Sequence, residues 1–422
     1  MKFGESTRKF GAPIACDVRT APEVPMTRRR ILISGAGIAG PALACALDPR
    51  LWDVTVVERA RELRPGGQAV DFRGPVHREV LDRLDLWGPI WERRTRGTDL
   101  VLLGRSGKPV ARMPSVMMSG DVEILRGDLS RLLVDRSASA GVQYRFSDRI
   151  AALRADADGV EVGFASGSKE TFDLVVGADG IHSGVRAVQF GDESKFLRHH
   201  GYLLATFSMR NVLRLSGEAL AYSVPGRSVM ISGDGSEVGR AQLIFAGAPL
   251  SRGERSDARA LRRRVREAYR NLEWEVPRVL EELDKSTDLY VDQIATVRLD
   301  RFCQGRVVLL GDAAWGGTLG GQGTSLGIVG AYVLASELTS AGADVENALA
   351  RYEAAMAPYA RENQKGAERA GSFFAPKTRA GRLLRDLAYR ALTSRPLIGQ
   401  FEKMVKASAT DFTLPSQPAL QP

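Results

Sequence analysis

The sequence has few of the residues that build metal sites, disulfide frameworks or membrane spans. Three cysteines and four histidines occur in 422 residues, without a CxxC pair or an HxxxH pattern. We therefore expect neither a disulfide framework nor a metal site, and the low cysteine count fits a reducing cytoplasm. The longest apolar run, residues 326–335, is far shorter than the ~18 residues of a membrane-spanning helix. Residues 1–25 lack the apolar core of a secretory signal, so we expect a loose N-terminal extension there.

The excess of positive charge is confined to the two ends of the chain. Lys and Arg number 59 and Asp and Glu 50, which gives a net charge of +9. Residues 1–30 carry +4 and residues 361–422 carry +6, so residues 31–360 are nearly neutral at −1. A basic chain is typical of nucleic-acid or anionic-surface binders, but a neutral body favours a small-molecule enzyme without a nucleic-acid partner. The arginine-rich helix expected at 255–273 has no interleaved aromatic residues for base stacking, which favours a solvated face.

Residues 31–60 have the order of a βαβ unit. Apolar and β-branched residues at 31–33 and 54–57 predict two strands, and small and apolar residues at 39–47 predict a helix between them. Such a unit commonly binds a dinucleotide at the turn between its first strand and its helix.

Three glycines in GxGxxG spacing occupy that turn. Gly35 permits a tight turn, Gly37 lets a pyrophosphate approach the backbone, and Gly40 lets helix and strand pack closely. Glu58 ends the second strand, where a carboxylate accepts hydrogen bonds from the hydroxyls of an unphosphorylated ribose. The sequence therefore predicts a tightly held dinucleotide.

Two later loops also follow buried strands at their carboxyl ends, where α/β sheets bind ligands. Residues 173–186, DLVVGADGIHSGVR, predict a strand and then a turn at Asp179. Residues 305–338 predict a strand, a glycine-dense loop that contains Asp312, and a helix that begins near Thr324.

Alternating apolar and polar runs at 195–250 predict an antiparallel sheet of about four strands. Phe207, Met209, Met230 and Phe245 of this sheet either roof an aromatic pocket or pack in the core, and the sequence favours neither.

Together the motifs resemble the group A flavin-dependent aromatic hydroxylases, the family of para-hydroxybenzoate hydroxylase and of the tetracycline-inactivating monooxygenases. The resemblance covers residues 31–340 and rests on GxGxxG with Glu58, on DLVVGADGIHSGVR, and on GRVVLLGDAA followed by GQGTS. It implies an α/β fold in which a Rossmann-type FAD-binding domain is interleaved with an antiparallel-sheet substrate domain and followed by C-terminal helices. It also implies tightly but non-covalently held FAD, NADPH or NADH as a transient reductant, and a small aromatic substrate.

The resemblance also implies roles for single residues. The glycine loop, residues 35–40, would cradle the pyrophosphate, Glu58 would hold the ribose, and Arg59 would lie beside the adenosine end. Arg126 would reach the pyrophosphate or the flavin edge, and Asp312 would bind the ribityl chain. The turn at Asp179 would touch both FAD and the nicotinamide nucleotide, and the helix start at Gly323 would direct its dipole towards the reduced flavin. The implied cofactor-binding set is Gly35, Ala36, Gly37, Ile38, Ala39, Gly40, Glu58, Arg59, Arg126, Asp179, Gly180, Asp312, Gly321, Gly323 and Thr324.

The implied reaction is hydroxylation of a phenolic or polycyclic aromatic compound, including polyketide-type compounds, through a flavin C4a-hydroperoxide. No catalytic base is identified: His199 and His200 are candidates, but a solvated pair at a strand start is the favoured interpretation. The segment WGGTLGGQG at 315–323 is one residue shorter than in several relatives and lacks their proline. This difference leaves open a non-redox, cyclase-like use of bound FAD, and an anionic-surface or nucleic-acid binder is a third, less favoured alternative. The sequence leaves open whether the protein is a monomer or a homodimer.

Two further helices are expected. Residues 123–134 predict a helix with Arg126 on its polar side. Residues 367–407 predict one or two helices broken near Ser394, lying across the flavin domain on a face formed by Leu383, Leu384, Leu387 and Leu392. The expected division of the chain is a loose extension at 1–25, an FAD-binding domain at 26–75, 115–190 and 290–365, a substrate domain at 76–114 and 191–289, and C-terminal helices with a loose tail at 366–422.

Overall fold

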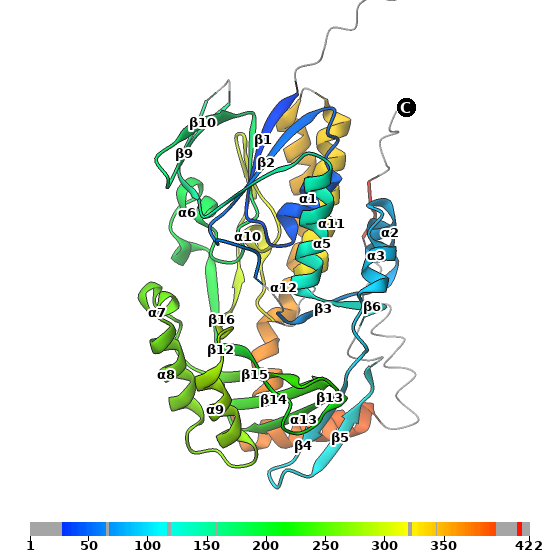
Figure 1. Cartoon of the computed structure of the whole chain (residues 1–422), viewed down its shortest axis with the longest axis vertical. Coiled ribbons are helices and arrows are strands. Elements are labelled where there is room, and N and C mark those ends of the chain that lie inside the picture. The colour runs from blue at the N-terminus through cyan, green and yellow to red at the C-terminus, as the bar shows by residue number, and fades with distance from the viewer. Residues whose placement is uncertain are drawn as a thin grey trace, which may run out of the picture.

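Two large β-sheets lie one above the other along the long axis of the molecule (Figure 1). The computed structural model describes residues 28–64, 67–115, 120–156, 159–319, 323–342, 344–393 and 412–415. The expected N-terminal extension, Gly321 and most of the expected tail lie outside these residues. The mixed α/β fold class expected from the sequence is confirmed.

The upper sheet forms from short runs of buried, mostly β-branched residues. Its order is β17-β18-β11-β1-β2-β7, and every neighbouring pair is parallel except β17 with β18. Because parallel strands need crossover connections, this sheet is covered by helices. Its strands are β1 (Arg29–Ser34), β2 (Trp52–Glu58), β7 (Gln143–Phe146), β11 (Leu174–Gly177), β17 (Cys303–Gln304) and β18 (Val307–Leu309).

Helices α1 (Ala39–Ala46), α5 (Arg126–Ser139) and α11 (Gly323–Ala341) pack beside this sheet. Helices α1 and α11 also approach each other closely. Small residues permit the approach, since a Cβ atom on Gly327 would lie 3.4 Å from the Ala39 Cβ. Helix α12 (Val345–Phe374) packs along α11 and continues down to the lower sheet (Figure 1). It therefore joins the two halves of the molecule.

The lower sheet has seven strands in the order β16-β12-β15-β14-β13-β4-β5. All neighbouring pairs are antiparallel except β13 with β4. The four strands expected within residues 195–250 are β12 to β15, and three strands from distant segments join them. The strands are β4 (Asp99–Leu103), β5 (Pro109–Met113), β12 (Leu197–Arg210), β13 (Ser216–Val224), β14 (Arg227–Asp234), β15 (Val238–Ala246) and β16 (Tyr290–Val297).

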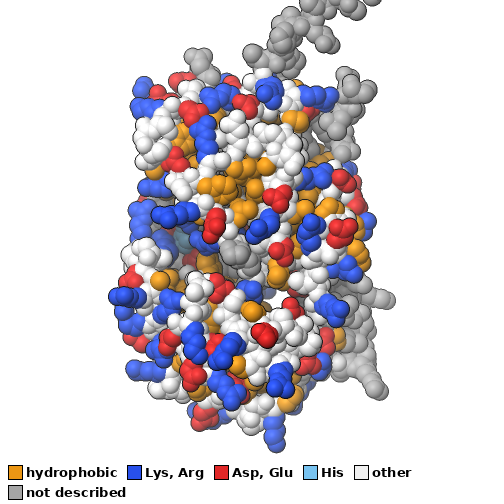
Figure 2. Space-filling model, in the orientation of Figure 1, with side chains coloured by type: hydrophobic (Ala, Val, Ile, Leu, Met, Phe, Trp, Pro, Cys, Tyr) orange, Lys and Arg blue, Asp and Glu red, His pale blue; other side chains and the backbone are white. Residues whose placement is uncertain are grey.

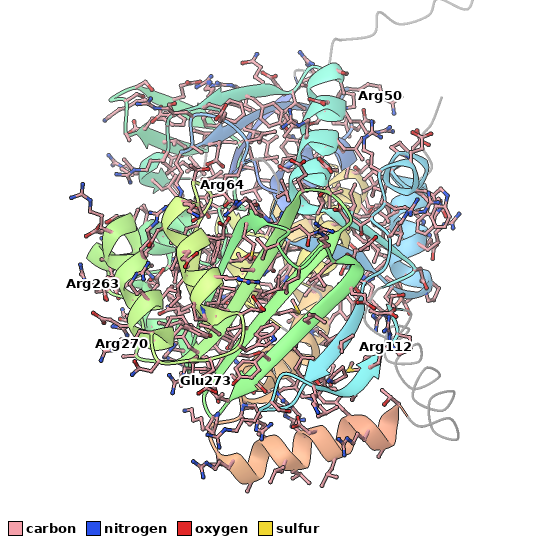
Figure 3. The ribbon with its side chains drawn as sticks, turned by 60° about the horizontal axis from the view of Figure 1, so that its bottom comes forward. Arg50, Arg64, Arg112, Arg263, Arg270 and Glu273 are labelled. Carbon is pink, nitrogen blue, oxygen red and sulfur yellow. The ribbon has the colours of Figure 1, made fainter. Side chains whose placement is uncertain are left out.

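Helices α8 (Ala258–Tyr269) and α9 (Val276–Lys285) cover one face of the lower sheet and form a second hydrophobic core with it. The arginine-rich segment 255–273 thus contains α8, preceded by α7 (Arg252–Ser256). Arg266 pairs with Asp284, and Arg263 and Arg270 point away from the protein (Figure 3). Basic and acidic side chains are interspersed over the face seen in Figure 2, which fits the solvated face favoured above.

The remaining elements pack around these two layers. Helices α2 and α3 belong to the upper hydrophobic core and β16 to the lower sheet, which differs from the boundaries expected at 76 and 290. These elements are β3 (Ala69–Phe72), β6 (Val122–Leu125), β8 (Ile150–Ala155), β9 (Val160–Phe164), β10 (Lys169–Phe172), α2 (Gly74–Arg83), α3 (Trp87–Glu92), α6 (Gly184–Gln189), the 3₁₀ helix η1 (Glu193–Lys195) and α10 (Asp312–Trp315).

The helix expected over 123–134 is wrong at its start. Val122 to Leu125 form β6, which pairs with β3, and helix α5 begins at Arg126. The strand pairing overrides the helical spacing of the leucines, and it places Arg126 at a helix N-terminus.

The C-terminal prediction needs three corrections. The chain leaves α12 after Phe374 and resumes as α13 (Arg379–Leu392), so an additional break lies at 375–378, while residues 394–407 lie outside the described residues. Helix α13 packs on the lower sheet, not across the upper half. Its buried face contains Asp386 and Tyr389, because Arg385 binds both Asp386 and Ser223 Oγ. Three of the leucines expected to pack are exposed, Leu383, Leu384 and Leu387, and the side chain of Leu392 is not among those described. The described part of the chain contains no helix long and apolar enough to cross a membrane.

Candidate cofactor and substrate site

Three loops meet at the carboxyl ends of neighbouring strands in the upper sheet. The glycine loop follows β1, the Asp179 loop (residues 178–183) follows β11, and the Asp312 loop (residues 311–319) follows β18. Because these strands are adjacent and parallel, motifs far apart in the sequence lie side by side. A Cβ atom on Gly35 would lie 2.5 Å from Ala178 O, and one on Gly311 would lie 2.9 Å from the Ala39 Cβ.

The glycine loop depends on the absence of side chains. Gly35 has a φ of +109°, which L-residues with side chains rarely adopt. A Cβ atom on Gly40 would lie 2.1 Å from Gly35 O, closer than any packing allows. A Cβ atom on Gly37 would meet only the Arg126 guanidinium, at 3.5 Å. Backbone N–H groups and a guanidinium therefore line the same small space, which suits an anionic group such as a pyrophosphate.

Glu58 holds the glycine loop from the neighbouring strand. Its Oε2 accepts a hydrogen bond from Ala36 N at 2.9 Å, and its Oε1 accepts one from Ala60 N at 2.8 Å. The carboxylate is thus oriented before any ligand binds, and each oxygen retains a further lone pair for a ribose hydroxyl. Arg59, the next residue, is exposed, and Ile38 and Ala39 begin α1.

Asp179 acts within its own loop. It accepts hydrogen bonds from Ser183 Oγ, from Gly184 N at 2.8 Å and from Val185 N at 3.1 Å, and so supports the start of α6. Burial raises the pKa of this carboxyl group. Gly180 follows with a φ of +84° and open space around its Cα. The backbone at Gly180 therefore faces outward, while the Asp179 side chain holds the turn.

Arg186 links the Asp179 loop to the Asp312 loop, and it is not among the site residues predicted from the sequence. It is completely buried and donates hydrogen bonds to Ala313 O at 2.8 Å and to Ile181 O at 2.6 Å. Arg186 is the last residue of the motif DLVVGADGIHSGVR, but the sequence does not indicate its hydrogen-bond partner in the Asp312 loop.

Asp312, the second residue of its loop, is exposed. A Cβ atom on Gly323 would lie 3.2 Å from its Oδ1, so this side chain stands at the start of α11, where Thr324 follows. Enclosure by protein raises the pKa of Asp312, Arg126 opposes this rise, and Asp292 adds to it. Arg126, Asp312 and the start of α11 therefore border one space.

The loop after Asp312 is anchored to the lower sheet. Val297 N donates to Gly316 O at 2.8 Å, and Thr318 Oγ1 donates to Gln293 O at 2.9 Å. Trp315 is buried against Phe302 and Tyr352. Its side chain is therefore part of the core. Residues 320–322, which complete the shortened loop, lie outside the described residues.

One row of side chains crosses the lower sheet beneath these loops. Strand register places its members opposite one another from strand to strand, and the row runs from polar to apolar: Tyr290, Thr206, Gln242, Met230, Ala221 and Leu102. We call this set the cleft row. Gln242 Oε1 accepts a hydrogen bond from Gln68 Nε2 at 2.9 Å, and Gln68 O accepts one from Arg126 N at 3.0 Å. The row thus adjoins the loops of the upper sheet.

Thr206 in the cleft row is 7% exposed, and its Oγ1 has no hydrogen-bond partner among the described residues. A buried hydroxyl without a partner costs free energy, and a polar group on a ligand would remove that cost. The opposite face of the sheet is different: Phe207, Met209 and Phe245 pack in the core against the α8 and α9 layer. Of the four residues proposed as a pocket roof, only Met230 lies on the cleft side.

The two candidate bases are engaged away from the cleft row. His199 Nε2 lies 3.1 Å from Tyr202 O, and His200 Nε2 lies 3.0 Å from Thr296 Oγ1. Burial lowers the pKa of both imidazoles. Among the described residues, no group of His, Cys, Asp and Glu is arranged to hold a metal ion.

The chain is similar to known flavoproteins over most of its length. The FAD binding domain family matches residues 28–367. A flavin-dependent monooxygenase of Legionella longbeachae is 34% identical over 342 residues, which cover 80% of this chain and 87% of the relative. An uncharacterised protein of Mycobacterium tuberculosis is 35% identical over 347 residues, which cover 80% of this chain and 92% of that protein.

Solved structures of flavoproteins are also similar to this chain. The tetracycline destructase Tet(51) superposes with a TM-score of 0.77 at 28% identity and covers 93% of this chain and 99% of its own. HpxO of Klebsiella pneumoniae, solved with FAD and uric acid, shares the fold with a TM-score of 0.70 at 23% identity, covering 89% and 96%. The chain therefore belongs to the FAD-binding-domain family of group A flavin-dependent monooxygenases.

Proposed function

We propose that this monooxygenase uses NADPH or NADH and dioxygen to hydroxylate a small phenolic or polycyclic aromatic compound, including polyketide-type compounds. The observation that carries this proposal is the contact between the loops of the upper sheet and the cleft row, made by the hydrogen bonds from Arg126 N to Gln68 O and from Gln68 Nε2 to Gln242 Oε1. Arg126 and Asp312 lie on one side of this contact, and a row that changes from polar to apolar lies on the other. This arrangement suits a cofactor next to a flat, mostly apolar substrate with polar groups at one end.

The residues around the cleft fit FAD. The glycine-loop amides and Arg126 would hold the pyrophosphate, Glu58 the adenosine ribose, and Asp312 the ribityl hydroxyls. Gly323 and Thr324 at the start of the long helix α11 would place positive partial charge near the flavin. When bound, FAD supplies the two-electron transfer from NAD(P)H and the activation of dioxygen.

The substrate would lie against the cleft row. Met230, Ala221 and Leu102 form the apolar end of the row, where they pack with Tyr389 of α13, and Thr206 and Gln242 at the polar end offer hydrogen bonds to a hydroxyl or carbonyl group. The unpartnered Thr206 Oγ1 favours a substrate with a polar group there. A tetracycline destructase is among the similar structures, which supports a polycyclic, oxygenated substrate class.

NAD(P)H would bind transiently, since the sequence holds one GxGxxG unit and that unit is assigned to FAD. The outward-facing backbone at Gly180 and the exposed rim of the cleft are the proposed contact region. The protein would then release the oxidised nucleotide before oxygen reacts.

The test begins with the protein loaded with FAD and reduced anaerobically by NADPH or NADH. Air containing ¹⁸O₂ is then admitted with phenols, a tetracycline and 4-nitrophenol as substrates. The proposal predicts bleaching of the flavin band at about 450 nm and a product that gains one ¹⁸O atom. Thr206→Val should raise KM more than it lowers kcat, while Thr171→Val, in the sheet of β8 to β10, should change neither. A product without added oxygen would favour the non-redox alternative.

A further inference from the structure

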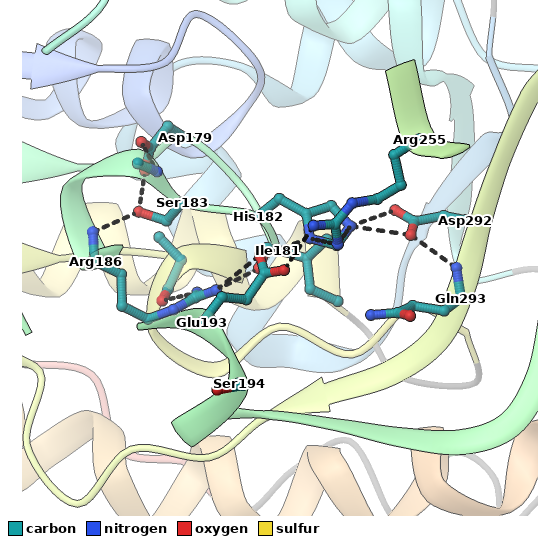
Figure 4. A network of polar contacts seen from close by, with 12 residues as sticks. Asp179, Ile181, His182, Ser183, Arg186, Glu193, Ser194, Arg255, Asp292 and Gln293 are labelled. Carbon is teal, nitrogen blue, oxygen red and sulfur yellow. Dashed lines mark hydrogen bonds and ion pairs between the residues drawn. The ribbon is translucent and has the colours of Figure 1, made fainter. Parts of the chain in front are cut away.

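Hydrogen bonds connect Tyr290 of the cleft row to the buried carboxylate of Asp292 and onward to His182 and Glu193; Figure 4 shows the part of this path from Asp292 to Glu193. Tyr290 OH donates to Asp292 Oδ2 at 2.7 Å. His182 Nε2 lies 3.0 Å from Asp292 Oδ1 and 3.2 Å from Oδ2, and His182 Nδ1 lies 2.8 Å from Glu193 Oε2. One oxygen, Asp292 Oδ2, is therefore within hydrogen-bond distance of both the imidazole and the phenol.

The residues at the two ends of this path are partly exposed to solvent, and the residue in its middle is buried. The Asp292 side chain is 5% exposed, whereas those of His182 and Glu193 are 20% and 25% exposed. Tyr290, at the other end, is 39% exposed on the cleft side. A hydrogen-bonded chain whose middle residue is buried and whose two ends are exposed can pass a proton without a continuous channel of water.

Tyr290 faces the cofactor side of the cleft. It is the polar end of the cleft row, opposite Thr206 in the sheet. Burial of its hydroxyl and the charge of Asp292 raise the pKa of Tyr290, while Arg126 lowers it and Asp312 raises it further. Two of the residues that act on this phenol, Arg126 and Asp312, are thus those that border the proposed flavin site.

The Nδ1 atom of His182 has a partner for each protonation state. Glu193 Oε2, at 2.8 Å, accepts a hydrogen bond when Nδ1 carries a proton. Arg255 Nη1, also at 2.8 Å, donates one when Nδ1 is bare. Burial alone lowers the pKa of His182, but the hydrogen bonds and charges of Asp292 and Glu193 outweigh it and raise the pKa above its ordinary value. Both states of the ring are therefore accommodated near neutral pH.

We propose that Tyr290, Asp292 and His182 form a proton path that delivers a proton from the exterior to dioxygen as it is reduced at the flavin. The inference rests on the proposed function, because it needs bound FAD and dioxygen. In the absence of substrate, an anionic two-electron-reduced flavin gives dioxygen two electrons and one proton. A second proton is then needed to form hydrogen peroxide.

The path supplies that second proton in one concerted step. The Tyr290 hydroxyl turns from Asp292 Oδ2 to the reduced oxygen and gives it its proton, while the Nε2 proton of the His182 imidazolium passes through the Asp292 carboxylate to the Tyr290 oxygen. Tyr290 and Asp292 end as they began, and His182 is left neutral, with its Nδ1–H donating a hydrogen bond to the ionised Glu193. A proton from solvent restores the imidazolium.

The charged groups around His182 come from four elements and set its titration. Asp292 lies on β16, Glu193 on η1 and Arg255 on α7. Arg186 of α6 lies 3.9 Å from Glu193, and Arg255 Nη2 pairs with Glu193 at 2.9 Å. The pKa of Glu193 is held at about 2, because the bonds from His182 and Arg255 outweigh burial. Glu193 therefore stays ionised, and His182 is the group that titrates.

The test measures reoxidation of the FAD-loaded, photoreduced enzyme by dioxygen without substrate, followed by flavin absorbance from pH 5.5 to 9 in H₂O and D₂O. The wild-type rate should fall as pH rises through the His182 pKa and should be slower in D₂O. Tyr290→Phe and His182→Gln should each slow the reaction about a hundredfold, the low end for a positioned proton donor, and flatten its pH profile. Imidazole added to His182→Ala should restore the rate in proportion to the imidazolium concentration, which a purely structural histidine would not show.

His200→Gln is the matched control, a half-buried histidine outside the path, and should leave the rate and pH profile unchanged. FAD affinity, measured by fluorescence quenching, identifies any variant that fails to fold, and Asp292→Asn then provides another break in the path. Variants that bind FAD and reoxidise with the wild-type rate and pH profile overturn the proton path. Because no substrate is present, this result is separate from the proposed function, which fails only if no product gains oxygen.

Discussion

The two sheets of this molecule contribute to the cleft in different ways. The upper sheet contributes mainly backbone: the glycine loop, the outward turn at Gly180 and the start of α11 are shaped by chain geometry. The lower sheet contributes side chains, which strand register brings into the cleft row from six neighbouring strands, β16 to β4. Backbone sites tolerate almost no change at a few positions, whereas a row of side chains can change one residue at a time. We therefore expect the backbone of the upper half to fix the choice of cofactor and the side chains of the lower half to determine the choice of substrate.

The largest effect is expected from a side chain in the glycine loop. Gly40→Val places a Cβ atom 2.1 Å from Gly35 O, which backbone cannot relieve without moving β1 or α1. We expect a loss of about 5 kcal/mol in the free energy of unfolding and no retained flavin. Urea denaturation and the visible spectrum provide the measurements. Gly253→Ala, where a Cβ atom meets nothing within 4 Å, is the control and should match wild type or exceed it.

The two faces of the lower sheet should separate stability from substrate binding. Phe207→Ala removes a buried ring from the core against the α8 and α9 layer and should cost about 4 kcal/mol. Met230→Ala, on the cleft face, should cost about 1 kcal/mol and alter KM for the best substrate. Urea denaturation and steady-state kinetics of both variants test this, and equal losses of stability would contradict the assignment of the two faces.

Two histidines should respond to acid in opposite ways. Burial lowers the pKa of His77, in α2 of the upper core, to about 4, so the folded state favours its neutral form. Its contribution is complete above pH 6.5 and is lost as pH falls towards 4, by about 3 kcal/mol in total. His182 has a raised pKa, so its contribution is present at low pH and is lost as pH rises through its folded-state value. Unfolding of His77→Gln between pH 4 and 7 should show a weaker acid dependence than wild type, and an unchanged slope would refute the assignment.

The smallest effect is expected at Glu58. Glu58→Gln keeps the shape of the side chain but turns one of its two acceptor oxygens into an amide donor, so it can accept only one of the two hydrogen bonds that Ala36 N and Ala60 N now donate. We expect about a tenfold weaker FAD affinity, or about 1.4 kcal/mol, and nearly unchanged stability. Titration of the flavin-free protein with FAD, followed by fluorescence, measures the FAD affinity. Glu62→Gln, in the turn that follows β2, should bind FAD as wild type does.

Much of the upper half could be predicted from the sequence because its signals are local. The βαβ order, the glycine spacing and Glu58 lie within 30 residues, and each has a direct mechanical reason. The Asp312 loop was recognisable because it follows a buried strand and precedes a helix. Even the lower strands β12 to β15 followed from alternation, which reports a sheet with one face in a core.

The remaining features depend on contacts between distant segments. Asp292 meets His182 across 110 residues and Arg186 meets Ala313 across 127, and no spacing rule relates such positions. The same holds for the cleft row, which depends on register between strands. The leucines of α13 suggested a packing face, but the polar bonds of Arg385 turn them outward. Helical spacing at 123–134 was overridden by the pairing of β6 with β3.

The most direct test of the central claim is the mass of the product formed under ¹⁸O₂ by the FAD-loaded enzyme with NAD(P)H. The account predicts that one ¹⁸O atom enters an aromatic substrate for each NAD(P)H oxidised, and that Gly40→Val forms none of this product. A substrate that is converted without gaining ¹⁸O, by an enzyme whose flavin is bound and reducible, would contradict it.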